Sequence, residues 1–250
     1  EGGNRSFNWN MPEEKNRTII DHISDIHFCY TEDARENLVA EGIKRRSTWV
    51  VGNPIVDVMH RNMGKRDVSV LDKFNVEKKN YILSTCHRAE NVTDPEVLSS
   101  ILTQLNEIGM KADMPVLLIE MPKLRENVKK HGLHYPEKVI PIAPQPYLEF
   151  LQLEKYSMLI ISDSGTVPEV ACSMRIPCIQ IREKTERMEL LENGSTILCA
   201  SSQDIVQPAL SLLEAMDMFA VEEVFVYKMN VAKKISRILL GNSINAWGRK

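Results

Sequence analysis

The segment Ser162-Asp163-Ser164-Gly165-Thr166-Val167-Pro168-Glu169 is the most informative part of this sequence. It follows the apolar run 158–161 and precedes residues 170–174, which have the pattern of a helix. The sequence therefore predicts a strand, a turn of small residues and a helix start, with Pro168 in the first helical turn. Free backbone N–H groups and the positive end of the helix dipole suit such a corner to phosphate. The same pattern also fits an ordinary strand-to-helix connection that Ser or Asp caps.

The amino-acid composition argues against some classes of protein. The chain has 250 residues, of which 43% are hydrophobic, so it can bury a sizeable core. Its net charge of −3 provides no broad basic field, and nucleic acid is therefore not an expected partner. No run approaches the roughly 18 apolar residues that a membrane span requires. The sequence predicts a cytoplasmic protein without a membrane partner.

Cysteines and histidines give no sign of a metal site. The five cysteines are odd in number and form no C-x-x-C pair; they are Cys29, Cys86, Cys172, Cys178 and Cys199. Four of them lie in or beside apolar runs, where a free thiol behaves as a small hydrophobe. The histidines lack metal-binding spacing. We therefore expect structural thiols in a reducing compartment, no metal and no cofactor.

Short β-branched runs alternate with longer amphipathic segments along the chain. This alternation is typical of parallel βαβ units with helices on both faces of a sheet. We expect strands at 26–30, 48–51, 81–85, 116–120, 139–142, 158–161, 178–181 and 196–199. We expect helices at 14–24, 34–41, 54–62, 95–108, 124–131, 146–153, 167–174, 202–215 and 231–240. The charged, turn-prone segment 64–79 is predicted to be a linker.

These elements predict an α/β chain with three parts. Residues 1–66 hold too few strands for a domain, so we expect them to be the remainder of an N-terminal Rossmann-like domain that lacks its first part. Residues 67–230 are predicted to form a complete, doubly wound C-terminal domain that binds a nucleotide. Residues 231–250 are expected to contain a helix that packs back on the N-terminal domain.

Four separated motifs resemble those of the non-hydrolysing UDP-N-acetylglucosamine 2-epimerases. They are Glu1-Gly2-Gly3-Asn4-Arg5 with Met11-Pro12-Glu13-Glu14-Lys15-Asn16-Arg17; Gly52-Asn53-Pro54; Cys86-His87-Arg88-Ala89-Glu90-Asn91; and 162–169 followed by Arg182-Glu183-Lys184-Thr185-Glu186-Arg187. Their order and spacing extend over essentially the whole chain. The resemblance implies the GT-B architecture of two doubly wound, parallel, Rossmann-like sheets. It also implies UDP-N-acetylglucosamine and UDP as ligands, and a homodimer.

The resemblance further implies that UDP-N-acetylglucosamine and UDP-N-acetylmannosamine are interconverted for surface polysaccharide synthesis. In this chemistry UDP leaves carbon 1 as a proton leaves carbon 2, which gives a 2-acetamidoglucal. The glucal is reprotonated on its other face and recaptures UDP. Such a site needs carboxylates that exchange protons and cations that bear the charge of the diphosphate.

The resemblance assigns catalytic roles to Glu1, Glu13 and His87. The two glutamates match the acid/base residues of the family, and His87 matches a residue near the leaving diphosphate. His87 follows the predicted strand 81–85, at the carboxyl end where doubly wound sheets place ligands. Glu13 follows Pro12 at a predicted helix start, where the helix dipole favours an acidic residue without any function.

The resemblance also implies a set of substrate-binding residues. The residues 164–166 would hold the phosphates, one glutamate would hold the ribose and one aromatic ring would pack near the uracil. The set is Arg88, Glu90, Asn91, Phe150, Ser164, Gly165, Thr166, Glu169 and Arg187.

Two departures from the family pattern leave other functions open. Relatives usually carry Gly-Gly and Glu-Glu where this chain has Gly165-Thr166 and Glu169-Val170. These differences allow a hydrolysing epimerase or a 2-epimerase of 6-deoxy amino sugars. The expected lack of a first part allows a non-catalytic UDP-sugar-binding fragment, and it predicts that the 250-residue chain alone is inactive.

Overall fold

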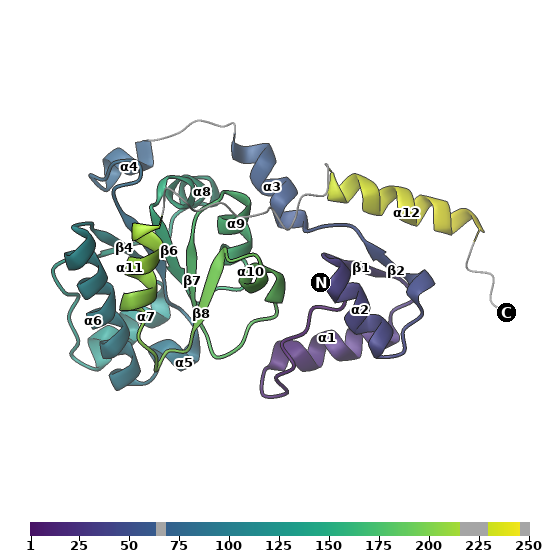
Figure 1. Cartoon of the computed structure of the whole chain (residues 1–250), viewed down its shortest axis with the longest axis horizontal. Helices are drawn as coiled ribbons and strands as arrows, with labels where there is room; N and C mark the ends of the chain where they lie inside the picture. Colours follow the sequence, from purple (N-terminus) through teal and green to yellow (C-terminus); the bar gives the residue numbers. More distant parts are fainter. Residues whose placement is uncertain (64–68, 216–229, 246–250) are drawn as a thin grey trace. The chain divides into compact units, whose positions relative to one another are not determined.

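The computed structural model describes residues 1–63, 69–215 and 230–245. Its contacts divide the chain into two compact units (Figure 1). Unit 1 comprises Glu1–Arg61 and Val224–Lys250, and unit 2 comprises Asn62–Glu223. All strand pairs in the described ranges are parallel, which confirms the predicted α/β class. That residues 1–66, 67–230 and 231–250 are the boundaries of true domains stays a prediction.

Unit 2 is built around a six-stranded parallel sheet in the order β5-β4-β3-β6-β7-β8. Its strands are β3 (Ile82–Thr85), β4 (Val116–Ile119), β5 (Val139–Ile142), β6 (Leu159–Ser162), β7 (Cys178–Ile181) and β8 (Thr196–Cys199). The chain adds strands on one side of β3 and then on the other side of β6, so the winding direction reverses between these two strands. Doubly wound sheets bind their ligands beyond the carboxyl ends of the strands at such a reversal.

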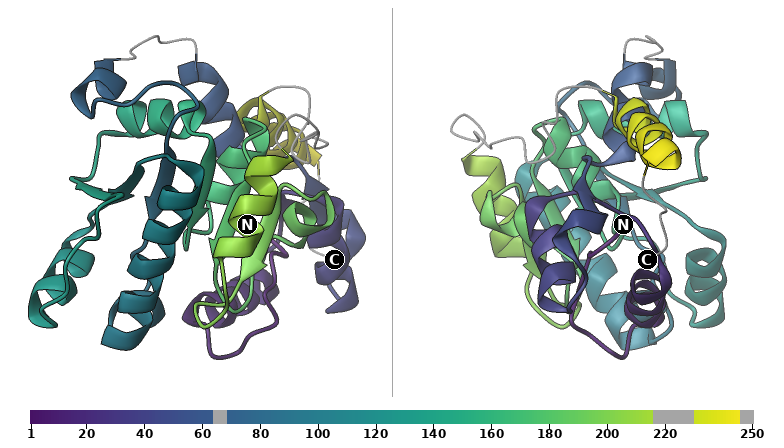
Figure 2. Two further views of the ribbon diagram at one scale, coloured as in Figure 1. Left: turned by 60° about the vertical axis from the view of Figure 1, so that its left-hand side comes forward. Right: turned by 90° about the vertical axis from the view of Figure 1, so that its right-hand side faces the viewer.

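Alternate residues of these strands pack into two apolar clusters, one on each face of the sheet. Ile82, Leu118 and Ile161 contribute to one cluster, together with α6 (Pro95–Ala112) and α11 (Val206–Glu214). The neighbouring strand residues contribute to the other cluster, together with α8 (Tyr147–Tyr156) and α9 (Val167–Ser173). The left view of Figure 2 shows α6 and α11 on the same side of the sheet. Further helices are α5 (Ala89–Val92), α7 (Pro122–Lys130) and α10 (Met188–Glu192).

Helix α6 shows how the sequence specifies these elements. The Asp94 carboxylate accepts hydrogen bonds from the backbone N–H of Glu96 at 2.8 Å and of Val97 at 3.3 Å, and Pro95 follows the cap. The helix buries a stripe at helical spacing, made of Leu98, Ile101, Leu102, Leu105 and Ile108. Cap and stripe together explain why the helix begins at residue 95 and which side faces the sheet.

The predicted linker at 64–79 is wrong in its described part. Residues of α4 (Ser69–Lys73) and of the turn after it join the second apolar cluster, and Val70, Leu71 and Val76 are buried. The backbone N–H of Val76 donates to the Leu71 carbonyl at 3.1 Å and closes the turn. A five-residue helix is too short to show a helical period, so the surrounding charges dominated the sequence pattern.

Unit 1 contains the short parallel strands β1 (His27–Cys29) and β2 (Thr48–Val50). Its helical elements are α1 (Pro12–Ile23), α2 (Glu32–Ala40), η1 (Arg45–Ser47), α3 (Pro54–Met63) and α12 (Val231–Asn245). The start of α12 is tied to α3 because the backbone N–H of Asn230 donates to Asp57 Oδ1 at 3.2 Å. Lys234 Nζ donates to the Val50 carbonyl of β2 at 2.6 Å.

The glycine pair near the start of the chain has a structural reason. Gly3 has a φ of +78°, and a Cβ atom there would lie 1.8 Å from the Ala34 carbonyl oxygen. Its backbone N–H donates to Asp21 Oδ2 at 3.1 Å, and its carbonyl accepts from Asn37 Nδ2 at 3.0 Å. Only glycine fits this close approach of residues 1–5 to α2.

The apolar helices and the cysteines bear on two expectations from the sequence. In the described ranges, no helix combines the length and apolar character that crossing a membrane would require. The five cysteines are all free and buried, which confirms the expectation of structural thiols. Burial raises the pKa of the Cys29 thiol to about 11.

Candidate functional site

The carboxyl ends of β3 and β6 meet where the winding of the sheet reverses. Their register pairs Thr85 with Ser162, and the two hydroxyl oxygens lie 2.5 Å apart. The chain continues from β3 into Cys86-His87-Arg88 and from β6 into Asp163-Ser164-Gly165. Two of the four motifs, which are distant in the sequence, therefore meet at the place where a doubly wound sheet holds its ligand.

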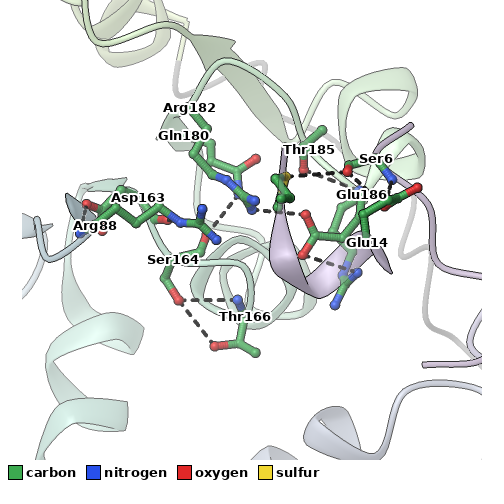
Figure 3. A network of polar contacts seen from close by, with 12 residues as sticks. Ser6, Glu14, Arg88, Asp163, Ser164, Thr166, Gln180, Arg182, Thr185 and Glu186 are labelled. Atoms are coloured by element: carbon green, nitrogen blue, oxygen red, sulfur yellow. Dashed lines mark hydrogen bonds and ion pairs between the residues drawn. The ribbon is translucent and has the colours of Figure 1, made fainter. Parts of the chain in front are cut away.

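Asp163 connects these two loops. Its side chain is fully buried, and its Oδ2 accepts hydrogen bonds from the backbone N–H groups of His87 and Arg88, both at 2.8 Å. The same oxygen accepts from Asn91 Nδ2 at 3.1 Å. Oδ1 lies 2.8 Å from Nδ1 of the His87 ring. The Asp163 carbonyl accepts from Arg88 Nε at 3.1 Å, and Figure 3 shows both residues.

His87 and Asp163 shift each other's protonation. The hydrogen bond to Asp163 raises the pKa of His87, although burial acts in the opposite direction. Burial acts to raise the pKa of Asp163, but the His87 ring and the backbone N–H groups of His87 and Arg88 outweigh it and hold the pKa below its usual range. The His87 side chain is 42% exposed, whereas that of Asp163 is 0% exposed. The pair thus favours the protonated form of the His87 ring at the edge of the sheet.

The predicted phosphate corner follows directly after Asp163. The Ser164 hydroxyl accepts from the backbone N–H of Thr166 at 3.3 Å and, more weakly, from that of Val167 at 3.5 Å. The Ser164 carbonyl accepts from Gln180 Nε2 at 2.8 Å, and Figure 3 shows the turn. The Ser164 hydroxyl thus bonds the backbone just before α9, whereas the N-cap residue Thr166 makes no side-chain cap hydrogen bond. Phosphate binding by residues 164–166 stays a prediction.

A buried network of arginines and glutamates lies next to this turn. Arg182 Nη1 pairs with Glu186 Oε2 at 3.0 Å, and Arg187 pairs with Glu169 and, at 3.8 Å, with Glu186 Oε1. A Cβ atom on Gly165 would lie 3.2 Å from Glu186 Oε1, so the turn approaches the network closely. Burial lowers the pKa of Arg182. The positive charges of two guanidinium groups and the negative charges of two carboxylates therefore offset each other in the protein interior.

The predicted binding residues differ in how far the structure buries them. Glu169 and Arg187 are buried and pair with each other, and Asn91 is buried with its Nδ2 bonded to Asp163 and to the Ile181 carbonyl. The other residues are accessible or half-buried: Arg88 and Glu90, which pair at 3.2 Å, Ser164, Gly165, Thr166, and Phe150, which packs against the second apolar cluster. Their roles toward a substrate stay predictions.

The two glutamates predicted to be catalytic lie in unit 1. Glu1 is exposed and pairs with Arg17 Nη2 at 2.9 Å, and Glu13 is exposed in the first turn of α1. The buried carboxylate of this segment belongs to Glu14. It accepts from the backbone N–H and hydroxyl of Ser6, both at 2.8 Å, and from the backbone N–H of Phe7 at 3.0 Å. Figure 3 shows Ser6 and Glu14.

Sequence reasoning missed several polar residues of the site. Asp163 stands inside the opening stretch but was not assigned a role, although a carboxylate between an apolar strand and a small-residue turn is a signal. Arg182 and Glu186 are four residues apart in the last motif, and Gln180 is a polar residue in an apolar strand. Within the described ranges, no group of three or more His, Cys, Asp or Glu side chains could hold a metal ion.

Comparison with known proteins identifies the family. The profile for UDP-N-acetylglucosamine 2-epimerase matches residues 1–240. The UDP-N-acetylglucosamine 2-epimerase of Methanocaldococcus jannaschii is 40% identical over 221 residues, covering 85% of this chain and 60% of that protein. The UDP-2,3-diacetamido-2,3-dideoxy-D-glucuronate 2-epimerase of Pseudomonas aeruginosa is 38% identical over 209 residues, covering 82% of this chain and 57% of that protein.

A solved structure agrees with these sequence matches. The crystal structure of the Methanocaldococcus jannaschii enzyme in complex with UDP-GlcNAc and UDP matches with a TM-score of 0.82 and 37% identity. The match covers 96% of this chain and 68% of that chain. The chain spans less than two thirds of the length of the two sequence relatives. Because the family profile extends over nearly all of the sequence, the chain belongs to the UDP-N-acetylglucosamine 2-epimerase family.

Proposed function

We propose that the protein carrying this chain interconverts UDP-N-acetylglucosamine and UDP-N-acetylmannosamine. The observation that carries the proposal, beyond family membership, is the His87–Asp163 pair at the reversal of the sheet. The reaction removes UDP from carbon 1 and a proton from carbon 2, and it returns both to the 2-acetamidoglucal intermediate. We further propose that the product feeds surface polysaccharide synthesis in the cytoplasm and that the enzyme is a homodimer.

His87 is proposed to stabilise the leaving diphosphate. Negative charge grows on the phosphate oxygens as the bond to carbon 1 breaks, and a fixed imidazolium lowers the energy of that transition state. The raised pKa of His87 supports this role because it keeps the ring charged to a higher pH. The backbone N–H groups of residues 164–166 are proposed to hold the phosphates, Glu169 the ribose and Phe150 the uracil.

Glu1 and Glu13 are proposed to exchange the proton at carbon 2. Both carboxylates are exposed, so they are accessible to a ligand. Glu14 is not proposed for this role, because it is buried and its two oxygens accept three hydrogen bonds from residues 6 and 7. The assignment rests on the family pattern.

A second substrate is favoured by one comparison. The Pseudomonas aeruginosa relative is named for a 2,3-diacetamido glucuronate, and its identity of 38% is close to the 40% of the Methanocaldococcus jannaschii relative. We therefore propose that a UDP-linked 2,3-diacetamido uronic acid is the alternative substrate. Assays with both sugars at equal concentration distinguish the two.

The proposed function is tested by solvent exchange. The protein is incubated with UDP-N-acetylglucosamine in D₂O, and mass spectrometry measures deuterium at carbon 2. His87→Ala is expected to slow exchange by roughly 10²–10³ because it removes a donor to the developing charge. His134→Ala, which changes an exposed histidine elsewhere in unit 2, is the matched control.

The products separate the remaining alternatives. Release of free N-acetylmannosamine together with UDP indicates a hydrolysing epimerase. Binding of UDP without exchange indicates a non-catalytic UDP-sugar-binding protein. Exchange at the full rate in the His87 variant contradicts the role given to that residue.

A further inference from the structure

Asp163 is a buried carboxylate at the centre of the site that the proposed reaction does not itself use. Its exposed fraction is 0%, and it follows β6 at the reversal of the sheet. Its Oδ2 accepts hydrogen bonds from the loop after β3 and from α5, through the backbone N–H groups of His87 and Arg88 and the Asn91 amide. A carboxylate in this position fixes the loop after β3 relative to β6.

The two oxygens of Asp163 have different partners. Oδ2 accepts three hydrogen bonds at 2.8–3.1 Å. Oδ1 lies 2.8 Å from the His87 ring nitrogen Nδ1. Because the carboxylate is buried, with three hydrogen bonds to Oδ2 and the His87 ring against Oδ1, it is not placed to meet a substrate directly. Asp163 therefore acts on chemistry through the residues that it contacts, and among these His87 is the one whose ring titrates near neutral pH.

The geometry determines which nitrogen of His87 can meet a ligand. A carboxylate oxygen at 2.8 Å from Nδ1 favours a proton on Nδ1, because an unprotonated nitrogen and the carboxylate oxygen would repel each other. Nε2 lies on the opposite edge of the ring, and the side chain is 42% exposed. Nε2 is therefore the nitrogen that a ligand can reach.

We propose that Asp163 is the positioning residue of this site. It keeps the proton of His87 on Nδ1 and holds the ring as an imidazolium whose Nε2–H is directed to an anion of the substrate. The identity of that anion as the diphosphate of a nucleotide sugar rests on the proposed function. The orientation and charge of the ring do not rest on it.

Other titratable groups that face the pair have defined effects. The Cys86 thiol is buried, and burial followed by the nearby Asp163 raises its pKa, so it stays neutral. Arg88 lowers the pKa of His87 and Glu90 raises it, and these two side chains pair with each other at 3.2 Å. Asp163 exceeds both in its effect on the His87 ring.

The sign of the pH dependence follows from these shifts. Because the pKa of His87 is raised on folding, the pair stabilises the folded state fully below the ordinary histidine value of about 6.5. This contribution is lost as the pH rises through the folded pKa of His87. Because the pKa of Asp163 is lowered, its contribution is present above about 3.9 and is lost as the pH falls through its folded value. The interaction is therefore complete between these two limits.

The proposal is tested by ¹⁵N NMR titration of the histidine rings in the whole protein. In the unmodified protein we expect His87 to carry its proton on Nδ1 and to titrate above the ordinary histidine range. Asp163→Asn should lower the pKa of His87 by about 1–3 units, the range for a lost opposite charge, and should release the tautomer. Glu120→Gln removes a carboxylate that pairs with Arg125 after β4 and should leave the titration of His87 unchanged.

A second measurement separates positioning from folding. The solvent-exchange rate should fall at high pH as His87 loses its proton, and Asp163→Asn should move this limb to lower pH by the same amount as the NMR shift. Asp163→Glu keeps the charge and should restore part of the rate. If Asp163→Asn does not fold, the tautomer and titration of the unmodified protein still decide the matter.

Different results would contradict the positioning role of Asp163 and the proposed function. A His87 that titrates in the ordinary range with its proton on Nε2 overturns the role of Asp163, whatever the enzyme does. A raised pKa of His87 without any epimerisation supports the positioning role and contradicts the proposed function.

Discussion

The two units bury apolar residues to very different extents. In unit 2 the strands β3, β4, β6 and β7 are buried along their whole length, with helices on both faces of the sheet. Among the described residues of unit 1, one apolar cluster contains Cys29, Ala34, Leu38 and Val50, with Ile43 packed against it, and Val51, Val56, Met59 and Val231 are also buried. Side chains of α1 stay exposed, and Ile19, Ile20 and Ile23 are 60%, 56% and 77% exposed.

The units also use their buried charges differently. In unit 1 the buried Arg5 pairs with Asp21 at 2.8 Å and with Glu41 at 2.7 Å, which joins the first residues to α1 and to the end of α2. Burial acts to lower the pKa of Arg5, but these two carboxylates outweigh it and raise the pKa. In unit 2 the paired buried charges of Arg182, Glu186, Glu169 and Arg187 lie beside the turn at residues 164–166. Unit 1 therefore uses ion pairs to hold its fold, whereas unit 2 has them at a candidate binding site.

The largest expected effect comes from breaking the buried pair of unit 2. Glu169→Ala leaves the Arg187 guanidinium in the interior without this carboxylate, and we expect a loss of about 3–5 kcal/mol in the unfolding free energy. Urea denaturation followed by fluorescence measures the loss. Glu183→Ala, an exposed neighbour in the same motif, should change stability by less than about 0.5 kcal/mol.

A stable Glu169→Ala protein would contradict the view that this pair is part of the unit 2 interior. If it folds but binds UDP more weakly in calorimetry, the ribose-binding role proposed for Glu169 is supported. Equal losses in both variants would mean that the motif tolerates no change, and the pair would then have no special role.

The next effect tests whether the units unfold separately. Leu118 in β4 and Leu38 in α2 are both fully buried, but they belong to different clusters. Replacing either with Ala should cost about 2–5 kcal/mol in the unit that holds it. Urea titrations should show two transitions, each shifted by only one of the variants. A single transition that both variants shift equally would show that the two units unfold together.

The fold of unit 2 could be predicted because its signals are local and repeated. The β5, β7 and β8 strands lie at the predicted residues, since each is a short apolar run between turn residues. The short helices α4, α5 and α10 were not predicted because four or five residues do not show a helical period.

The site could be predicted only in part. His87 and the turn at Ser164 were found because both follow a predicted strand, and parallel strands end at the same edge of a sheet. The role of Asp163 could not be read from spacing, because its carboxylate bonds to backbone N–H groups of a loop that is distant in the sequence. Glu14 bonds to the nearby residues 6 and 7, but the sequence does not show which of the two adjacent glutamates points inward. Tertiary packing sets both choices, and a single sequence does not report it.

A smaller effect is expected in unit 1 at the buried Glu14. Glu14→Gln keeps the shape but replaces one acceptor oxygen by a donor, so the hydrogen bond from the backbone N–H of either Ser6 or Phe7 is lost. We expect a loss of about 1–3 kcal/mol in the unit 1 transition and faster hydrogen exchange at one of these two residues. Glu13→Gln, at the exposed neighbouring position, is the control for stability. If Glu13→Gln destabilises unit 1 and Glu14→Gln does not, the roles given to the two glutamates are reversed.

The smallest effect on folding is expected at the exposed face of α1. Ile20 and Ile23 are mostly exposed, so replacing both with Lys should change the unfolding free energy by about 0.5 kcal/mol or less. The same change should reduce self-association, because contiguous exposed apolar side chains favour contact between molecules and added charges oppose it. Sedimentation velocity at several concentrations measures the association.

Met110→Lys changes a residue of α6 in unit 2 that is 50% exposed, and this variant is the matched control. We expect association to fall in the α1 variant alone, because it removes two neighbouring exposed apolar side chains of one helix, whereas the α6 variant removes one. Equal association in all three proteins would show that the exposed isoleucines of unit 1 are not the contact surface.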